Sequence, residues 1–409
     1  MADVRFAVVG IVGYARTHLK TLMELEQAGE GIRLEAVVAK FPEEDPPFVE
    51  ELKNRGVKVY GDLDELFSDA QGRVDVVTLP TSIPSHAPLS VAALEAGFHV
   101  LCEKPPAPTV QEVDRMIAAA KKSGRHCSIG FQDIHGPSIQ RLKSMLVSGA
   151  LGEVRDAACR GIWPRPGSYY QRNRWAGRYR ANGDYILDGP MNNALAHFLH
   201  AMLYLVGGTQ RECAQPRSVQ AELYRARRDI DGDDTGCLRL TTTSGVDIHF
   251  NVTHAADQTV EPVIELRTTE ATIHWERSGT TVITYRDGRV ERFDNGGTTG
   301  RLELFRDMAG VVRGEREEPI GKVDYTRPFV VAVNGAHESS QVIHQIPEEF
   351  VEARPTGKGD QYVIQGIHEL SRRAFDERRL FSELGAPWAV ATAPFPLEGY
   401  AAFPVRARG

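Results

Sequence analysis

An acid, a lysine and two prolines directly follow an apolar strand in the segment VLCEKPP at 100–106. The expected helix before it, 88–97, carries apolar residues at helical spacing and ends on glycine, so the strand that starts near His99 should be buried. Open parallel sheets keep their reactive groups at the carboxyl ends of the strands. Because the prolines restrict the backbone behind Lys104, this lysine is held better than one on a mobile loop. A solvated Lys-Pro turn is the alternative interpretation.

A second set of reactive residues lies in the segment 183–207. Pro190 suits a helix start, which would place Asn193 and His197 four residues apart on one helix face. A histidine can take or give a proton near neutral pH, although a lone helical histidine is often only structural. His200 lies on nearly the same face and is the second candidate base. Asp188 is the nearest acid.

A glycine-bearing turn joins the first expected strand, 6–10, to the first expected helix. Such a turn can hold a pyrophosphate, because the amides and dipole of a helix N-terminus stabilise negative charge. The dinucleotide fingerprint requires glycine at positions 10, 12 and 15, whereas this chain has Gly10, Val12 and Ala15, with an extra Gly13. Val12 places a branched side chain where the backbone should approach the phosphates. A simple strand–turn–helix is the competing interpretation.

The second expected strand, 34–39, ends at Lys40. An acidic residue at this place would bind the ribose of NAD, whereas a cation suits the 2'-phosphate of NADP. Lys40 therefore favours NADP.

Strands and helices alternate through the first 130 residues, which indicates a parallel α/β sheet. Further strands are expected at 57–60, 74–79 and 127–131, and a helix at 110–120. The turn from Pro80 to His86 lies between the 74–79 strand and the helix that precedes Glu103 and Lys104. We expect a dinucleotide-binding domain over 1–130.

The pattern of the sequence changes from Ala157. The segment 163–177 is rich in Trp, Tyr and Arg, which suit stacking on sugar rings and bonding to hydroxyls, although a loop packed over a sheet edge is equally consistent. Its candidate substrate residues are Arg172, Asn173 and Trp175. Alternating strands from 219 to 285 then predict an antiparallel sheet with one solvated face. The acidic run 229–234 lacks EF-hand spacing and is expected to be a solvated turn.

Composition narrows the possible classes of protein. The chain of 409 residues has 48 basic and 55 acidic residues, a net charge of −7 and no basic stripe, which argues against nucleic acid as a partner. Its five cysteines lie far apart, which argues against a disulfide framework or a structural metal site. With no signal peptide and no apolar run of membrane-spanning length, we expect a cytoplasmic protein without membrane or metal partners.

Four features together resemble the Gfo/Idh/MocA oxidoreductases, the family of glucose-fructose oxidoreductase and inositol dehydrogenase. They are the strand with its glycine turn, the turn from Pro80 to His86, LEAGFHVLCEKP at 94–105 and GALGEV at 149–154. The resemblance implies a Rossmann domain followed by an α+β domain with an open, mostly antiparallel sheet at 131–409 that binds substrate. It also implies a homo-oligomer, a dimer or tetramer, formed through the open sheet face.

The resemblance also assigns roles to residues. It implies catalysis by Lys104, His197 and Asn193, of which Asn193 occupies a place that is Asp in the family, while Asp188 stands five residues earlier. The expected cofactor residues are Gly10, Val12, Gly13, Tyr14, Ala15, Lys40, Pro80, His86, Glu103 and Lys104. The expected substrate residues are Lys104, Arg172, Asn173, Trp175, Asn193 and His197.

We therefore expect an NAD(P)-dependent oxidoreductase that transfers hydride between the nicotinamide and a secondary alcohol or ketone of a sugar, cyclitol or sugar derivative. One alternative is a redox-neutral member of the family, such as a glycosidase, epimerase or lyase that regenerates a bound NAD. The other is a binding or regulatory protein that keeps the fold without chemistry, which Val12 and Asn193 would allow.

Overall fold

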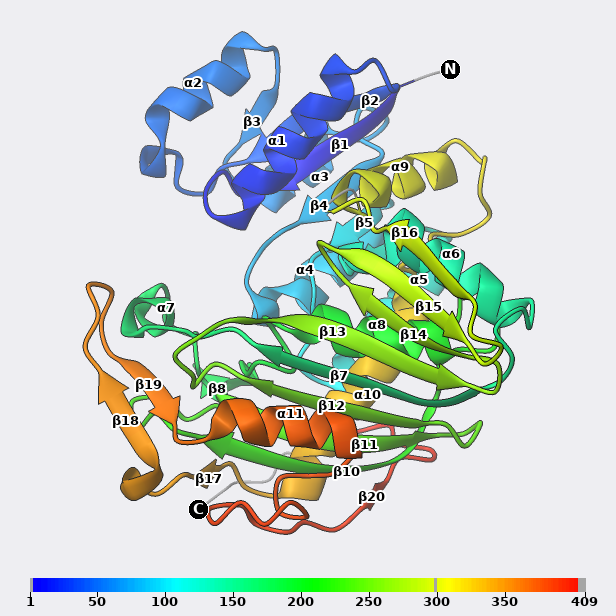
Figure 1. Cartoon of the computed structure of the whole chain (residues 1–409). Coiled ribbons are helices and arrows are strands. Elements are labelled where there is room, and N and C mark those ends of the chain that lie inside the picture. The colour runs from blue at the N-terminus through cyan, green and yellow to red at the C-terminus, as the bar shows by residue number, and fades with distance from the viewer. Residues whose placement is uncertain (1–2, 298–299, 404–409) are drawn as a thin grey trace. The chain divides into compact units, whose positions relative to one another are not determined.

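The computed structural model describes residues 3–297 and 300–403, which form two compact units. Unit 1 contains residues 3–107, 111–135 and 300–326, and unit 2 contains residues 108–110, 136–297 and 327–403. The fold class predicted from the sequence, a Rossmann-type parallel sheet followed by a mostly antiparallel sheet, is confirmed (Figure 1).

Unit 1 is built on a six-stranded parallel sheet with the order β3-β2-β1-β4-β5-β6. Its strands are β1 (Val4–Val9), β2 (Ile32–Val38), β3 (Lys58–Tyr60), β4 (Val76–Leu79), β5 (His99–Cys102) and β6 (Cys127–Ile129). The helices are α1 (Tyr14–Gln27), α2 (Pro46–Asn54), α3 (Leu63–Asp69), α4 (Ile83–Glu95) and α5 (Val110–Ser123), with 3-10 turns η1 (Pro42–Glu44) and η2 (Gln132–His135). The strands are almost continuously buried, as expected for a parallel sheet covered by helices.

Helix α9 (Gly300–Val312) belongs to unit 1, although the sequence analysis assigned all of 131–409 to the second domain. Its apolar residues Leu304, Phe305 and Met308 are buried in the same core as strand β1. The Phe305 ring lies edge-on to Phe6 at a centroid distance of 5.7 Å. The sequence boundary at residue 130 is therefore wrong for this segment, because the chain returns to the first core far along the sequence.

Unit 2 is built on a ten-stranded sheet whose main path is β16-β15-β14-β13-β7-β12-β11-β10-β17, with β20 paired to β10. The strands are β7 (Val154–Ile162), β10 (Pro216–Arg225), β11 (Thr235–Thr242), β12 (Asp247–Thr253), β13 (Val260–Thr268), β14 (Ala271–Glu276), β15 (Thr280–Tyr285), β16 (Val290–Asp294), β17 (His344–Gln345) and β20 (Phe395–Pro396). Two small hairpins are separate, β8 (Arg180–Ala181) with β9 (Asp184–Tyr185) and β18 (Val351–Arg354) with β19 (Gln361–Ile364).

Helices lie on both faces of this sheet. The helical elements in this part of the chain are α6 (Pro137–Val147), α7 (Gly167–Gln171), α8 (Ala196–Val206), α10 (Val323–Ser340), α11 (Ile367–Glu377) and the 3-10 turn η3 (Glu348–Phe350). Leu195, just before α8, meets Gly161 of β7, whereas the next residue, Ile162, packs in a core with Ile367 of α11. Because neighbouring residues of a strand point to opposite faces, α8 and α11 cover opposite sides of the sheet.

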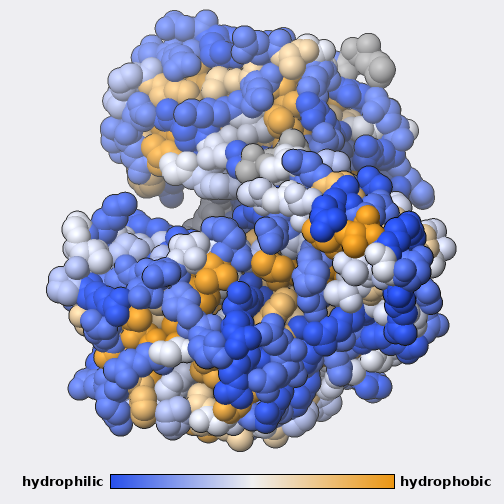
Figure 2. Space-filling model, in the orientation of Figure 1, coloured by the Kyte–Doolittle hydropathy of each residue, from blue (hydrophilic) through white to orange (hydrophobic). Residues whose placement is uncertain are grey.

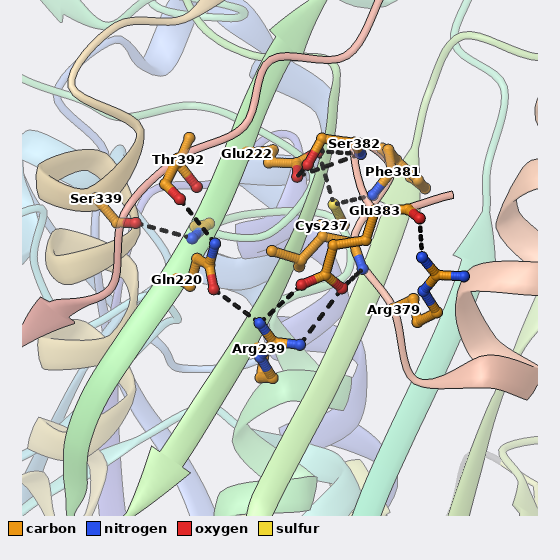
Figure 3. Close-up of polar contacts among 12 residues, drawn as sticks. Gln220, Glu222, Cys237, Arg239, Ser339, Arg379, Phe381, Ser382, Glu383 and Thr392 are labelled. Carbon is orange, nitrogen blue, oxygen red and sulfur yellow. Dashed lines mark hydrogen bonds and ion pairs between the residues drawn. The ribbon is translucent and has the colours of Figure 1, made fainter. Parts of the chain in front are cut away.

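The C-terminal segment after α11 continues the cover of the sheet (Figure 3). The Ser382 hydroxyl donates to the buried Glu222 carboxylate at 2.5 Å, and Arg239 pairs with Glu383 at 2.9 Å. The expectation that this sheet face is open is therefore wrong over β7 and β10–β12. Self-association remains a prediction.

No helix within 3–297 and 300–403 is long and apolar enough to cross a membrane. The face of the molecule drawn in Figure 2 is mostly hydrophilic, with apolar residues in small separate groups.

Candidate active site

The glycine turn of unit 1 has the backbone that a phosphate-binding turn requires. Gly10 and Gly13 have φ values of 105° and 59°, which favour glycine. A Cβ on Gly10 would lie 3.2 Å from the Cβ of Ala15, so Ala15 packs closely under the turn. Val12 and Tyr14 are 40% and 44% exposed, so the side chain of Val12 is not part of the core.

The first turn of α1 is suited to binding a negatively charged group. Gly13 occupies the N-cap position without a side-chain hydrogen bond, and the first turn contains no acidic residue. The amides of a helix start that is not capped by a side chain can bind a pyrophosphate. The residues at 10–15 thus fit a dinucleotide, despite the imperfect fingerprint.

Lys40 and Pro80 lie at the carboxyl ends of β2 and β4, two strands that both flank β1. The turn expected from Pro80 to His86 is shorter than predicted, because α4 already begins at Ile83 and contains His86. Lys40 is exposed, and its Nζ lies 5.7 Å from the centroid of the Phe41 ring. His86 is buried, with Nδ1 at 2.7 Å from the carbonyl oxygen of Pro105 and Nε2 at 3.1 Å from that of Thr81. His86 therefore ties the turn to the segment that follows Lys104.

Glu103 is held in a buried network that the sequence analysis did not find. His18 of α1 lies with Nε2 at 2.9 Å from one Glu103 carboxylate oxygen, and the backbone N–H of Lys104 donates to the other at 3.1 Å. A Cβ on Gly130 would lie 2.7 Å from this carboxylate. Burial alone would raise the pKa of Glu103, but the His18 hydrogen bond and nearby positive charge lower it below its usual value. The carboxylate thus links the dinucleotide helix to the half-buried Lys104.

In unit 2, the expected helix start at Pro190 is wrong. Helix α8 begins at Ala196, and Leu195 is its N-cap. The preceding turn does not have α-helical hydrogen bonding throughout, because the Leu195 amide donates to the Pro190 carbonyl five residues earlier. Asn193 therefore precedes the helix, and Asn193 and His197, although four residues apart in sequence, do not share a helix face. His197 lies in the first turn of α8 and is buried.

His200, the second candidate base, is buried among packing residues. Its Nε2 lies 3.7 Å from the Cys213 sulfur, and its ring meets Phe329 edge-on. These contacts favour a structural role for His200 over a role as base.

Asn193 and Asp188 act together. The Asn193 carboxamide donates to Asp188 at 2.7 Å, and the Gly177 amide donates to the other carboxylate oxygen at 2.6 Å. Asp188 is 3% exposed, and Leu187 before it has a φ of 54°, unusual for a bulky residue. Strained backbone of this kind clusters at functional sites. A carboxylate is thus present beside Asn193 in unit 2.

Asp233 is a further buried acid that the sequence analysis placed in a solvated turn. It is 4% exposed, and one of its carboxylate oxygens has no hydrogen-bond partner. Its carboxyl group would lie 2.2–2.4 Å from a Cβ on Gly189, the residue after Asp188. Burial first, and then the nearby Asp234 and Asp188, raise the pKa of Asp233 to about 8.

The aromatic segment 163–177 contains the short helix α7 and a turn held by Asn173. The Asn173 side-chain oxygen accepts from the amides of Trp175 and Ala176, at 3.0 and 2.8 Å, so it shapes the turn. The Arg172 guanidinium lies 3.8 Å from the carboxylate of Asp188 and 5.2 Å from the centroid of the Trp175 ring. The structure therefore brings together Arg172, Trp175, Asp188 and Asn193.

Two family models match the chain. Residues 4–131 match the oxidoreductase family with an NAD-binding Rossmann fold, and residues 139–274 match the GFO/IDH/MocA C-terminal domain. Together they span more than half of the chain.

Among curated proteins, the chain is 26% identical over 211 residues to D-glucoside 3-dehydrogenase of Escherichia coli, covering 45% of this chain and 57% of that protein. It is 38% identical over 97 residues to inositol 2-dehydrogenase of Salmonella typhimurium, covering 24% of this chain and 28% of that protein. These matches span only part of the relatives' length.

Solved structures share the fold over a longer range. The WlbA dehydrogenase of Bordetella pertussis, solved with NADH and UDP-GlcNAcA, matches with a TM-score of 0.67 and 22% identity over 83% of this chain and 97% of that one. An Agrobacterium radiobacter oxidoreductase with NAD+ and L-tartaric acid matches with a TM-score of 0.69 and 17% identity over 83% and 97% of the two chains. From its two domain matches and its fold, the chain belongs to the GFO/IDH/MocA family of oxidoreductases.

Proposed function

We propose that the protein is an NAD(P)-dependent oxidoreductase that acts on a secondary alcohol or ketone of a sugar, cyclitol or sugar derivative. The observation that carries the proposal is the Gly10–Ala15 turn, which leads into a helix start without a side-chain cap, in the same unit as Lys104. The names of the relatives, a glucoside dehydrogenase and an inositol dehydrogenase, support this substrate class.

The dinucleotide would be held by the Gly10–Ala15 turn with Tyr14, and by Lys40, Pro80, His86 and the segment at Glu103 and Lys104. When bound, its nicotinamide supplies or accepts the hydride. The exposed Lys40 would favour a 2'-phosphate, and NADP is the proposed preference.

Lys104 would polarise the reacting oxygen of the substrate, because its ammonium group stabilises negative charge that develops there. His197 would take the hydroxyl proton during oxidation and return it during reduction. Asn193, fixed by its hydrogen bond to Asp188, would orient the substrate, with Arg172 and Trp175 beside it.

Alanine variants test these two roles. Lys104→Ala and His197→Ala should each lower kcat by about two to four orders of magnitude, the usual range for acid–base groups, with unchanged circular dichroism. Lys121→Ala, which removes an exposed lysine from α5, is the matched control and should keep full activity. Normal turnover in a folded Lys104 or His197 variant would overturn the assignment.

A further inference from the structure

The segment around α7 concentrates positive charge. Residues 161–180 contain five arginines and no lysine, aspartate or glutamate, although the whole chain has a net charge of −7. Two of these arginines, Arg165 and Arg172, meet at one aromatic ring. The Cζ atoms of Arg165 and Arg172 lie 4.8 and 3.6 Å from the centroid of the Tyr169 ring. Cation–π contacts of this kind fix the two guanidinium groups without cancelling their charge.

Protein carboxylates do not neutralise this pair. Arg165 makes no ion pair within the described residues, and its buried Nε has no hydrogen-bond partner there. The nearest carboxylate to Arg172 is Asp188 at 3.8 Å, which already accepts hydrogen bonds from Asn193 and Gly177. The two guanidinium groups thus have one carboxylate contact between them, that of Arg172 with Asp188, and the cluster has a net positive charge.

A neighbouring histidine does not change this balance of charge. His254 lies 5.8 Å from Tyr169 by ring centroids, and its Nδ1 is 2.7 Å from the Trp163 carbonyl oxygen. Burial, together with the nearby Arg165, lowers the pKa of His254 to about 3. His254 is therefore neutral at physiological pH, and the cluster's charge belongs to its arginines.

The turn between β18 and β19 holds α7 in place. The Ser168 amide donates to the Lys358 carbonyl at 2.8 Å. Gly167 and Gly359 meet backbone to backbone, since a Cβ on Gly359 would lie 3.1 Å from the Cα of Gly167. Side chains would not fit between these two segments, so the contact defines where α7 begins.

Arg227 fixes the same junction from a third segment. Its guanidinium lies 4.7 Å from the Tyr170 ring centroid and 4.6 Å from that of Tyr362, and it donates to the Asp360 carbonyl at 2.9 Å. Arg227 is 4% exposed, so these contacts are shielded from water. The residues next to Tyr169 are thus preorganised, which lowers the entropy cost of binding.

We propose that Arg165 and Arg172 bind an anionic group of the substrate, so that the site takes an acidic sugar derivative in preference to a neutral sugar. This inference rests on the proposed function. A guanidinium group can bind a carboxylate or a phosphate through two parallel hydrogen bonds, and preorganised cations on an aromatic ring offer this geometry. The cluster includes the Arg172–Asp188–Asn193 contacts, which places the anionic group beside the residues that would orient the substrate.

The test compares D-glucose, D-glucuronate and D-glucose 6-phosphate as probes, by calorimetry on the protein saturated with NADH or NADPH, whichever binds more tightly, and by turnover with NAD+ or NADP+. We expect at least one of the two acids to bind and react better than glucose, and which acid it is distinguishes carboxylate from phosphate. Arg165→Gln should weaken the binding of that acid about tenfold to a hundredfold, with a larger effect on KM than on kcat. The binding and turnover of glucose should not change. Arg165→Lys should recover part of the lost affinity, because lysine restores the positive charge but not the two parallel donors of a guanidinium group.

Arg174→Gln is the matched control, since it removes the same charge from the same segment at an exposed residue. Preference for glucose, binding of none of the three probes, or an Arg165→Gln variant with unchanged preference would overturn the inference. Binding of NADH and of NADPH is measured first by their fluorescence. A protein that binds neither dinucleotide contradicts the proposed function itself, so the two failures are distinguishable.

Discussion

Replacing Asp233 by Asn should make the protein more stable at high pH, although the Asn side chain does not reproduce every polar contact of the buried carboxyl group. Burial and the neighbouring acids Asp234 and Asp188 raise the pKa of Asp233 to about 8 from its ordinary value of 3.8. The folded state therefore keeps a proton that the unfolded chain loses above pH 4. A group with a raised folded pKa contributes full stability below its unfolded pKa, and this contribution is lost as the pH rises through the folded pKa.

The size of the effect follows from the interval between the two pKa values. One pKa unit corresponds to about 1.4 kcal/mol, so the interval between pH 5 and pH 8 corresponds to at most about 4 kcal/mol. Relaxation around a buried acid reduces this limit, and we expect about 2–4 kcal/mol. For a domain the size of unit 2, this is a difference of roughly 5–10 °C in Tm.

The assay is thermal unfolding of the wild type and of Asp233→Asn at several pH values from 5 to 8. The stability of the variant relative to wild type should increase steadily with pH. Asp231→Asn is the matched control, because Asp231 is an exposed acid in the same turn, and it should show no such trend. Parallel Tm curves for wild type and Asp233→Asn would refute the argument that Asp233 is protonated in the folded protein.

Three other perturbations have defined outcomes. His18→Leu should destabilise the protein by about 3–5 kcal/mol, because it leaves the buried Glu103 carboxylate without its side-chain partner. His18→Gln keeps a donor and should cost less. Equal losses of stability for the two variants in denaturant unfolding would contradict this role. Lys143→Met should lower the free energy of unfolding by about 2–4 kcal/mol in the same assay, since Lys143 donates to the Tyr204 carbonyl and, at 2.7 Å, to that of Gly207. An unchanged midpoint of denaturant unfolding would show that water replaces the lysine. Lys40→Asp should reduce the ratio of NADP to NAD affinity by about tenfold to a hundredfold; an unaltered ratio of dissociation constants would show that Lys40 does not contact the ribose.

The parallel sheet of unit 1 was predictable because each of its strands is a short apolar run followed by a turn and a helix. The strand that ends at Cys102 and the turn at Gly10 follow this rule, so the positions of Glu103 and Lys104 followed from sequence alone. Helix α9 was assigned to the wrong unit, because sequence patterns do not show which core a distant helix joins.

The candidate residues of unit 2 were less predictable. Proline at position 190 is compatible with a helix start, but five residues of irregular turn separate it from α8, and local composition does not distinguish the two. Helix α10 was missed, since its valine-rich middle also suits a strand and Pro328 lies inside it.

Buried polar partners were the hardest feature to predict. The run 229–234 has the composition of a solvated turn, yet Asp234 is buried and accepts hydrogen bonds from the amides of Ala226 and Arg227. His18 carried one usable signal: it lies three residues after Ala15 on the apolar face of α1, where a polar residue needs a partner. The identity of that partner depends on the tertiary fold.

Oxidoreductase activity is tested most directly by following absorbance at 340 nm while the purified protein is incubated with NAD+ or NADP+ and a panel of sugars, cyclitols and sugar acids. We expect a steady, substrate-dependent formation of reduced cofactor, which Lys104→Ala and His197→Ala abolish. Turnover of a panel compound without net change in absorbance would instead indicate a redox-neutral enzyme. Binding of dinucleotide and sugar without turnover would contradict the catalytic account and favour a binding protein.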